Sequence, residues 1–262
     1  MNDVLRQILN WYLQSGVTET TGLIPLNRLN PSDESVLLKA PLPPPTTAAA
    51  SVEQETVLPD NLFESAINTA RNATSLEELK SALLQFDGCP LKKTAKNTVF
   101  GQGNPHAQVM FIGEAPGADE DRLGLPFVGL SGQLLDKIMQ AIGLSRQTNA
   151  YISNIIPWRP PGNRAPSDME ISLCLPFIKR HIELIRPKII VTLGSIAFTA
   201  LLGKSETISH ARGVWHTYQT ENLPAPIDVL PVFHPAFLLR TPAQKKAIWH
   251  DFLMIQDKLQ KN

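Results

Sequence analysis

The chain of 262 residues contains 24 Lys and Arg against 24 Asp and Glu, and 43% of its residues are hydrophobic. This length predicts one domain plus an extension, and zero net charge argues against a protein that coats nucleic acid, which is usually strongly basic. Two cysteines are too few for a disulfide framework. Because no apolar run approaches the roughly 18 residues of a membrane span and no secretory signal is recognisable, we expect a cytoplasmic protein without membrane contact. We also expect a monomer, since nothing in the sequence requires a larger assembly.

The first 59 residues divide into a short helix and a linker. Apolar residues recur at helical spacing near the start of the chain: Val4, Leu5, Ile8, Leu9 and Tyr12. This spacing predicts an amphipathic helix over residues 1–16. Residues 17–59 include PLPPPTTAAASVEQET, whose composition cannot form a core and is typical of a disordered linker. The helix either packs on the domain or binds a partner protein.

From residue 60 to residue 262, segments typical of strands and of helices alternate. The expected buried strands are 109–113 (VMFIG), 150–156 (AYISNII), 188–194 (KIIVTLG) and 228–233 (DVLPVF). The expected helices are 62–71, 75–84, 132–144, 171–185, 195–203 and 243–259. Such alternation predicts a three-layer α/β/α sandwich around a mostly parallel, four-stranded central sheet.

Polar side chains accompany three of these strands near their carboxyl ends. Glu114 directly follows the first strand, Asn154 lies within the second, and His234 follows the last. Each residue alone has an ordinary interpretation as a loop or capping residue, although a buried amide must find hydrogen-bond partners. Ligands of open parallel sheets bind beyond the carboxyl ends of the strands, so the joint placement of the three indicates a site.

Four sequence blocks resemble the signatures of family 4 uracil-DNA glycosylases, which belong to the uracil-DNA glycosylase superfamily. They are GEAPGADED at 113–121, GLPFVGLSG at 124–132, NIIPWRPPGNRAP at 154–166 and HPAFLLR at 234–240. The resemblance runs from about Cys89 to about Leu253. It implies an enzyme that flips uracil out of DNA and hydrolyses its N-glycosidic bond. The abasic site that remains initiates base excision repair.

The resemblance assigns catalysis to two residues. Glu114 matches the carboxylate near the sugar, which orients the attacking water and stabilises the cationic sugar. His234 resembles the donor to uracil O2, where negative charge develops as the bond breaks. Four further residues are expected to bind the substrate: Phe127 by stacking on the base, Asn154 by pairing with uracil O4 and N3–H, and Gly113 and Glu120 from the first of the four blocks.

The same resemblance predicts how the protein holds DNA. Arg159, Arg164 and Arg240 lie in loops expected to face the backbone, where guanidinium groups bind phosphate well. Leu238 and Leu239 resemble an apolar tip that wedges into the base stack; their other interpretation is the hydrophobic start of the last helix. We therefore expect uracil-containing DNA as the partner.

The chain departs from the family at an iron–sulfur site. The resemblance implies a [4Fe–4S] cluster held by four cysteines, but the matching positions are Phe86, Cys89, Trp158 and Cys174. Two thiolates cannot supply four ligands, and too few Cys and His are present for structural zinc. We therefore expect no cofactor and no metal, with the two aromatic side chains filling the vacated volume and the two thiols buried close together.

Three alternatives remain open from the sequence. In the first, the domain is a DNA-binding relative without catalysis, an interpretation that the missing cysteines motivate. In the second, it is a glycosylase for another deaminated base, since the sequence does not reveal the size of the pocket. Alternatively, the N-terminal helix binds a repair or replication protein and tethers the domain to it, which is compatible with catalysis.

Overall fold

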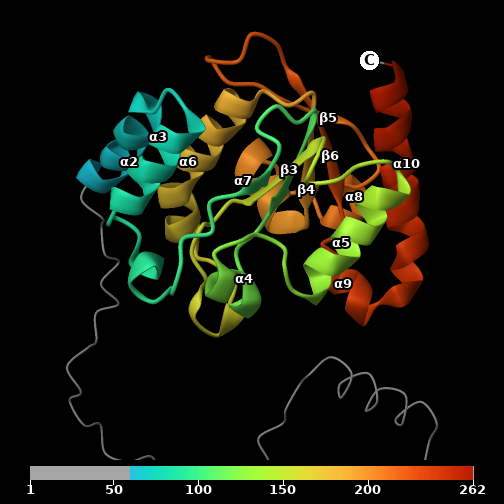
Figure 1. Cartoon of the computed structure of the whole chain (residues 1–262), viewed down its shortest axis with the longest axis horizontal. Coiled ribbons are helices and arrows are strands. Elements are labelled where there is room, and N and C mark those ends of the chain that lie inside the picture. Colours follow the sequence, from blue (N-terminus) through green and yellow to red (C-terminus); the bar gives the residue numbers. More distant parts are fainter. Residues whose placement is uncertain (1–59, 262) are drawn as a thin grey trace, which may run out of the picture. The chain divides into compact units, whose positions relative to one another are not determined.

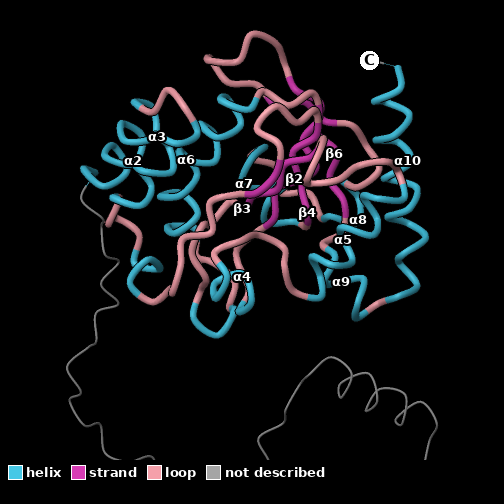
Figure 2. The backbone as a smooth tube through the Cα atoms, in the orientation of Figure 1, coloured by secondary structure: helices cyan, strands magenta, loops and turns pink. Residues whose placement is uncertain are grey.

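The computed structural model describes residues 60–261. The helix expected over residues 1–16 and the linker expected over 17–59 lie outside the described residues. The described part is built on one sheet of six strands in the order β1-β3-β2-β4-β6-β5. Figures 1 and 2 show the sheet with helices on either side.

The four central strands are parallel to one another: β3 (Ala150–Asn154), β2 (Val109–Gly113), β4 (Ile189–Leu193) and β6 (Ile227–Val232). They are the four strands that the sequence predicts, and nearly all their residues are buried. This burial on both faces explains why they appear in the sequence as continuous apolar runs. The expected four-stranded sheet needs one correction, because antiparallel strands β1 (Gln102–Gly103) and β5 (His216–Tyr218) extend its edges.

Helices cover both faces of the sheet (Figure 1). One face carries α2 (Asp60–Asn72), α3 (Leu76–Gln85), α6 (Asp168–Ile185) and α7 (Ser195–Leu202). The other carries α5 (Leu130–Ala141), α8 (Ile208–Ala211), α9 (Pro235–Arg240) and α10 (Lys245–Lys261). Neighbouring strand residues point to opposite faces, so Ile190 packs in the first layer while Ile189 and Val191 pack in the second. The three-layer arrangement is confirmed.

The remaining elements are short and lie in connections: α4 (Ala118–Leu123) and the 3₁₀ turns η2 (Pro90–Lys93), η3 (Pro161–Asn163) and η4 (Pro242–Gln244). Within the described residues, each helix expected from the sequence is present within a few positions of its expected ends. The start of α6 is secured by a capping box, in which the Ser167 hydroxyl accepts from the Glu170 backbone and the Glu170 carboxylate from the Ser167 backbone. No helix in residues 60–261 is long and apolar enough to cross a membrane.

Candidate active site

A pocket of about 490 Å³ opens at the carboxyl ends of the parallel strands. Its lining brings together residues from all four sequence blocks that the sequence analysis singled out: Glu114, Glu120, Phe127, Asn154, Arg164, His234 and Arg240. Strands β2, β3 and β6 end at this edge of the sheet. The pocket therefore lies where an open parallel sheet is expected to bind its ligand.

Strands β2 and β3 position the amide of Asn154. Asn154 is in register with Gly113, and the pairing continues past the strands as the Ile155 N–H donates to the Gly113 carbonyl at 2.9 Å. The Asn154 side chain is buried, yet its Oδ1 has no hydrogen-bond partner within the described residues. Because an unpaired buried acceptor costs free energy, this oxygen is suited to a ligand that brings a donor.

Gly113 allows the pocket wall to close tightly. A Cβ atom at this position would lie 2.5 Å from the Asn154 Oδ1 and 2.6 Å from the Phe127 ring. Any side chain here would therefore displace both residues. Gly113 lies behind the predicted binding groups and acts by leaving them room.

Phe127 places its ring against the pocket from an unusual backbone conformation. Its φ angle is 52°, in the left-handed region, which costs a non-glycine residue about 1–3 kcal/mol. The ring is nearly buried and lies 5.7 Å, centroid to centroid, from the His234 ring. The two rings form one corner of the pocket.

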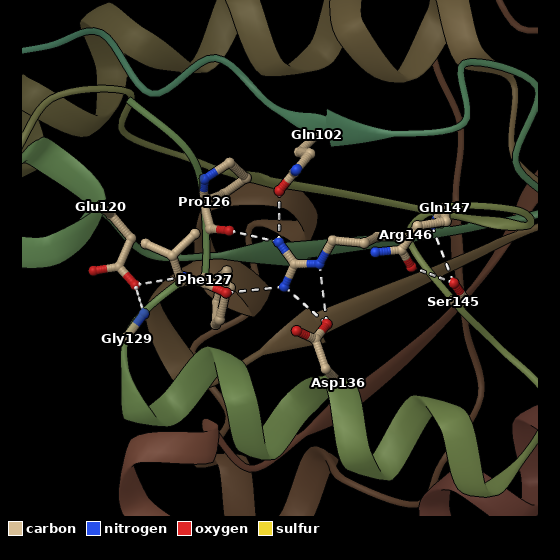
Figure 3. A network of polar contacts seen from close by, with 10 residues as sticks. Gln102, Glu120, Pro126, Phe127, Gly129, Asp136, Ser145, Arg146 and Gln147 are labelled. Atoms are coloured by element: carbon tan, nitrogen blue, oxygen red, sulfur yellow. Dashed lines mark hydrogen bonds and ion pairs between the residues drawn. The ribbon is translucent and has the colours of Figure 1, made fainter. Parts of the chain in front are cut away.

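Glu120 holds the backbone that follows Phe127. One oxygen of its buried carboxylate accepts hydrogen bonds from the N–H groups of Val128 and Gly129, both at 2.9 Å. Figure 3 shows this carboxylate facing the loop. The carboxylate thus has a structural task in addition to its place in the pocket lining.

His234 is the N-cap residue of α9, and this position determines its tautomer. Its Nδ1 accepts a hydrogen bond from the Ala236 N–H at 3.1 Å, so the neutral ring carries its proton on Nε2. Burial, followed by the positive charge of Arg240, lowers the pKa of His234 to about 4. At neutral pH the residue is therefore an uncharged donor.

Glu114 is half-buried at the end of β2, and burial raises the pKa of its carboxyl. No hydrogen bond or ion pair ties this carboxylate to another described residue, so its oxygens remain available to a water molecule or a ligand. Its backbone carbonyl accepts from the Ile156 N–H at 2.9 Å. The backbone thereby anchors the carboxylate beside the strand that carries the amide.

The predicted DNA-contacting arginines differ in their surroundings. Arg240 is exposed on the pocket rim, with no ion-pair partner in residues 60–261. Arg164 makes a bidentate ion pair with the buried Glu170, at 2.8 and 2.6 Å. Arg159 donates from Nε to the Asn163 Oδ1 at 2.7 Å. Arg240 is therefore the arginine of the three that is most accessible to a phosphate.

The prediction for Leu238 is corrected. Leu238 is fully buried in the core, whereas Leu239 is 45% exposed. Successive residues of a helix point about 100° apart, so one turns inward when the other turns outward. The sequence analysis did not single out Leu130, an apolar side chain that is 74% exposed at the start of α5, directly before Ser131 of the pocket lining. The sequence pointed to it only as an apolar residue in the block that contains Phe127.

The four positions that match the cluster cysteines lie in one apolar core. Phe86 packs on Phe177 with ring centroids 5.1 Å apart, and Trp158 is 1% exposed with its Nε1 donating to the Thr98 Oγ1 at 2.9 Å.

The expected neighbouring thiols are confirmed, since the sulfur atoms of Cys174 and Cys89 are 3.9 Å apart. Both side chains are fully buried. Their hydrogen bond, followed by burial, raises the pKa of the Cys174 thiol. Within residues 60–261, no group of three or more His, Cys, Asp and Glu is arranged to hold a metal ion.

Comparisons with known proteins place this fold and pocket in a family context. The model of the uracil DNA glycosylase superfamily matches residues 100–253. A type-4 uracil-DNA glycosylase of Saccharolobus solfataricus is 43% identical over 190 residues, which cover 71% of this chain and 87% of the relative. That of Archaeoglobus fulgidus is 37% identical over 185 residues, covering 69% and 92%. A type-5 uracil-DNA glycosylase of Pyrobaculum aerophilum is 32% identical over 114 residues, covering 38% and 50%.

Proposed function

The chain belongs to the uracil-DNA glycosylase superfamily, and from this premise we propose that its pocket receives a uracil flipped out of DNA. The enzyme hydrolyses the N-glycosidic bond and leaves an abasic site, the first step of base excision repair. A base inside a duplex is unreachable, so it must be extruded into a fitted pocket. The observation that carries the proposal is the Asn154 amide oxygen, which has no partner among residues 60–261 and lies in the same pocket as the neutral His234 donor.

Asn154 and Phe127 recognise the base. The free Oδ1 of Asn154 accepts from uracil N3–H, and its Nδ2 donates to O4. Cytosine presents an acceptor and a donor in the reverse order, so a fixed amide discriminates against it. The Phe127 ring supplies the stacking surface, and Gly113 keeps both groups at close range.

His234 and Glu114 act on the bond that breaks. As the C1′–N1 bond opens, uracil leaves with a growing negative charge, and the Nε2–H of His234 donates to its O2. The oxygen of a water molecule bonds to C1′ while the Glu114 carboxylate orients that water and stabilises the cationic sugar. The proton that the water loses neutralises the departing uracil anion, so the products are the abasic sugar and neutral uracil. A preorganised donor such as His234 contributes roughly 3–4 kcal/mol to transition-state stabilisation.

DNA is held around the mouth of the pocket. Arg240, exposed on the rim, and Arg159 contact backbone phosphates, whereas the partly exposed Arg164 does so while it stays paired with Glu170. Leu239 is the apolar side chain that enters the base stack. Because the substrate is DNA, an intracellular location is part of the proposal. So is a catalytic domain of residues 60–262, with the segment before it as the binding site for a repair or replication protein.

The residues at the cluster positions do not fit a [4Fe–4S] cluster. Two thiols remain, and buried aromatic rings occupy the other two positions, whereas the cluster needs four ligands. We propose that packing of Phe86 and Trp158 replaces coordination and that the domain folds without the cluster. Stoichiometric iron and sulfide in the purified protein would contradict this proposal.

The test of function uses end-labelled DNA with a single uracil, incubated with the protein and then treated with alkali to break abasic sites. Cleavage at uracil and not at a matched thymine, strongly reduced by Glu114→Ala and by His234→Ala, supports the proposal. The control Glu64→Ala changes an exposed carboxylate on α2 and should leave the rate unchanged. Binding of uracil-DNA without any cleavage would favour a DNA-binding relative without catalysis. Cleavage at another deaminated base instead of uracil would favour a glycosylase for that base.

A further inference from the structure

Arg146 lies in the connection between α5 and β3, and its side chain is only 7% exposed. It does not line the pocket. Its guanidinium group nevertheless reaches the loop that carries Phe127, as Figure 3 shows. A charged group buried to this extent must be paired and hydrogen-bonded to be stable.

All five N–H donors of Arg146 are used. Nε and Nη2 donate to the Asp136 Oδ1 at 3.0 and 2.8 Å, and Nη1 donates to the Gln102 Oε1 at 2.8 Å. The remaining two donors go to backbone carbonyls, from Nη1 to Pro126 and from Nη2 to Phe127, both at 2.9 Å. One rigid, planar group thus fixes two successive carbonyls, which an ammonium group cannot do with the same geometry.

The loop needs such fixing because its conformation is unfavourable. Phe127 adopts a φ of 52°, and a strained residue persists only where its surroundings over-determine it. Two further contacts act on the same loop. Glu120 accepts from the next two backbone N–H groups. On α5, a Cβ at Gly132 would lie 1.9 Å from the Phe127 carbonyl oxygen, so only glycine lets the loop pack there.

We propose that Arg146 is a positioning residue for the reaction, which holds the Phe127 backbone so that the ring faces the pocket before the base arrives. The inference rests on the proposed function, in which Phe127 stacks on the flipped base. Preorganisation of this kind lowers the entropy loss on binding and the free energy needed to reach the transition state. Asp136 and Gln102 in turn hold the guanidinium group in place.

The test is a double-mutant cycle between Arg146→Lys and Phe127→Ala, with kcat/KM measured on DNA containing one uracil. We expect Arg146→Lys alone to lower kcat/KM roughly 10- to 100-fold, the loss typical of a small misplacement near a reaction centre. In the Phe127→Ala background the same substitution should change kcat/KM less than about twofold, because the group it positions is absent. An equal loss in both backgrounds, or no loss in either, would overturn the proposal.

Further measurements separate positioning from stability. Arg180 is a matched control: it also pairs with a buried carboxylate, Glu183, and also donates to a backbone carbonyl, that of Ala73, but it does not line the pocket. Arg180→Lys should lower the melting temperature while kcat/KM stays unchanged below it. If Arg146→Lys does not fold, Asp136→Ala tests the proposal instead. It removes the carboxylate that holds the guanidinium group and leaves the hydrogen bonds from Arg146 to the two backbone carbonyls. We expect a smaller loss that again vanishes with Phe127→Ala, and persistence of that loss would overturn the proposal.

The same cycle distinguishes failure of the inference from failure of the proposed function. If the wild-type protein does not excise uracil, or if Phe127→Ala excises it at the wild-type rate, the proposed function of the pocket or of the ring fails, and the inference fails with it. If Phe127→Ala is slow and Arg146→Lys is additive with it, only the inference fails.

Discussion

The protonation state of His234 predicts how the reaction depends on pH. Burial, then the charge of Arg240, lowers its pKa from 6.5 to about 4. The difference corresponds to roughly 3 kcal/mol in favour of the neutral ring, so at pH 6 only about 1% of the rings carry a second proton. We therefore expect kcat to show no titration near pH 6.5.

Glu114 determines how kcat decreases on the acid side of the pH–rate profile. Burial raises its pKa above the ordinary 4.5, and protonation removes the negative charge that stabilises the sugar cation. We expect kcat to be constant at neutral pH and to fall on acidification with a midpoint above 4.5. Glu114→Gln should lower kcat and remove this decrease, whereas His234→Ala should lower kcat roughly 100- to 1,000-fold and keep it.

The assay is single-turnover cleavage of uracil-containing DNA from about pH 5 to 8.5, at constant ionic strength because phosphate contacts are salt-dependent. Circular dichroism at each pH is required as a control. Burial also lowers the pKa of His181, to about 3. Both His181 and His234 therefore take up protons more readily in the unfolded chain, and the stability of the fold decreases as the pH falls below about 6.5. A kinetic midpoint near 6.5 that disappears in His234→Ala would refute the neutral-donor mechanism.

Three further predictions concern the base, the duplex and the N-terminal segment. Asn154→Asp replaces the amide donor by an acceptor, so excision of uracil should fall at least about 100-fold while cytosine becomes acceptable; unchanged selectivity between the two bases in the cleavage assay would count against base reading by Asn154. Leu239→Ala should slow excision from double-stranded DNA and spare single-stranded DNA, whereas Val214→Ala, also at an exposed apolar residue, should affect neither; equal losses on both substrates would exclude a wedge. Deletion of residues 1–59 should leave the rate on short DNA unchanged, and a collapse would mean that this segment belongs to the folded core.

The central strands were predictable because burial on both faces leaves an unbroken apolar run in the sequence. The edge strands were not, since two and three residues are too few for alternation to appear. The same limit applies to Leu238 and Leu239. They are identical in type and adjacent in sequence, and the rotation of about 100° per helix residue separates their environments.

The main pocket residues were predictable from chemistry and resemblance, but the support for Phe127 was not. Its left-handed backbone leaves no mark in the sequence, because the residues that usually adopt it are Gly and Asn. Arg146 acts on carbonyl groups 19 and 20 positions away, and a backbone carbonyl has no residue type for a motif to record. Such contacts depend on the fold, which brings together residues that are distant in the sequence.

The cluster positions and the pocket meet in the segment that follows β3. Asn154, which ends the strand, lies in the pocket lining, and Ile155, Ile156 and Trp158 belong to the core that also contains Phe86 and the two cysteines. A cluster at these positions would hold this segment from behind by coordination. Here the fully buried indole, hydrogen-bonded to Thr98, fills the same core. What the pocket requires from this region is a fixed backbone under the amide, and close packing supplies rigidity of that kind without a metal.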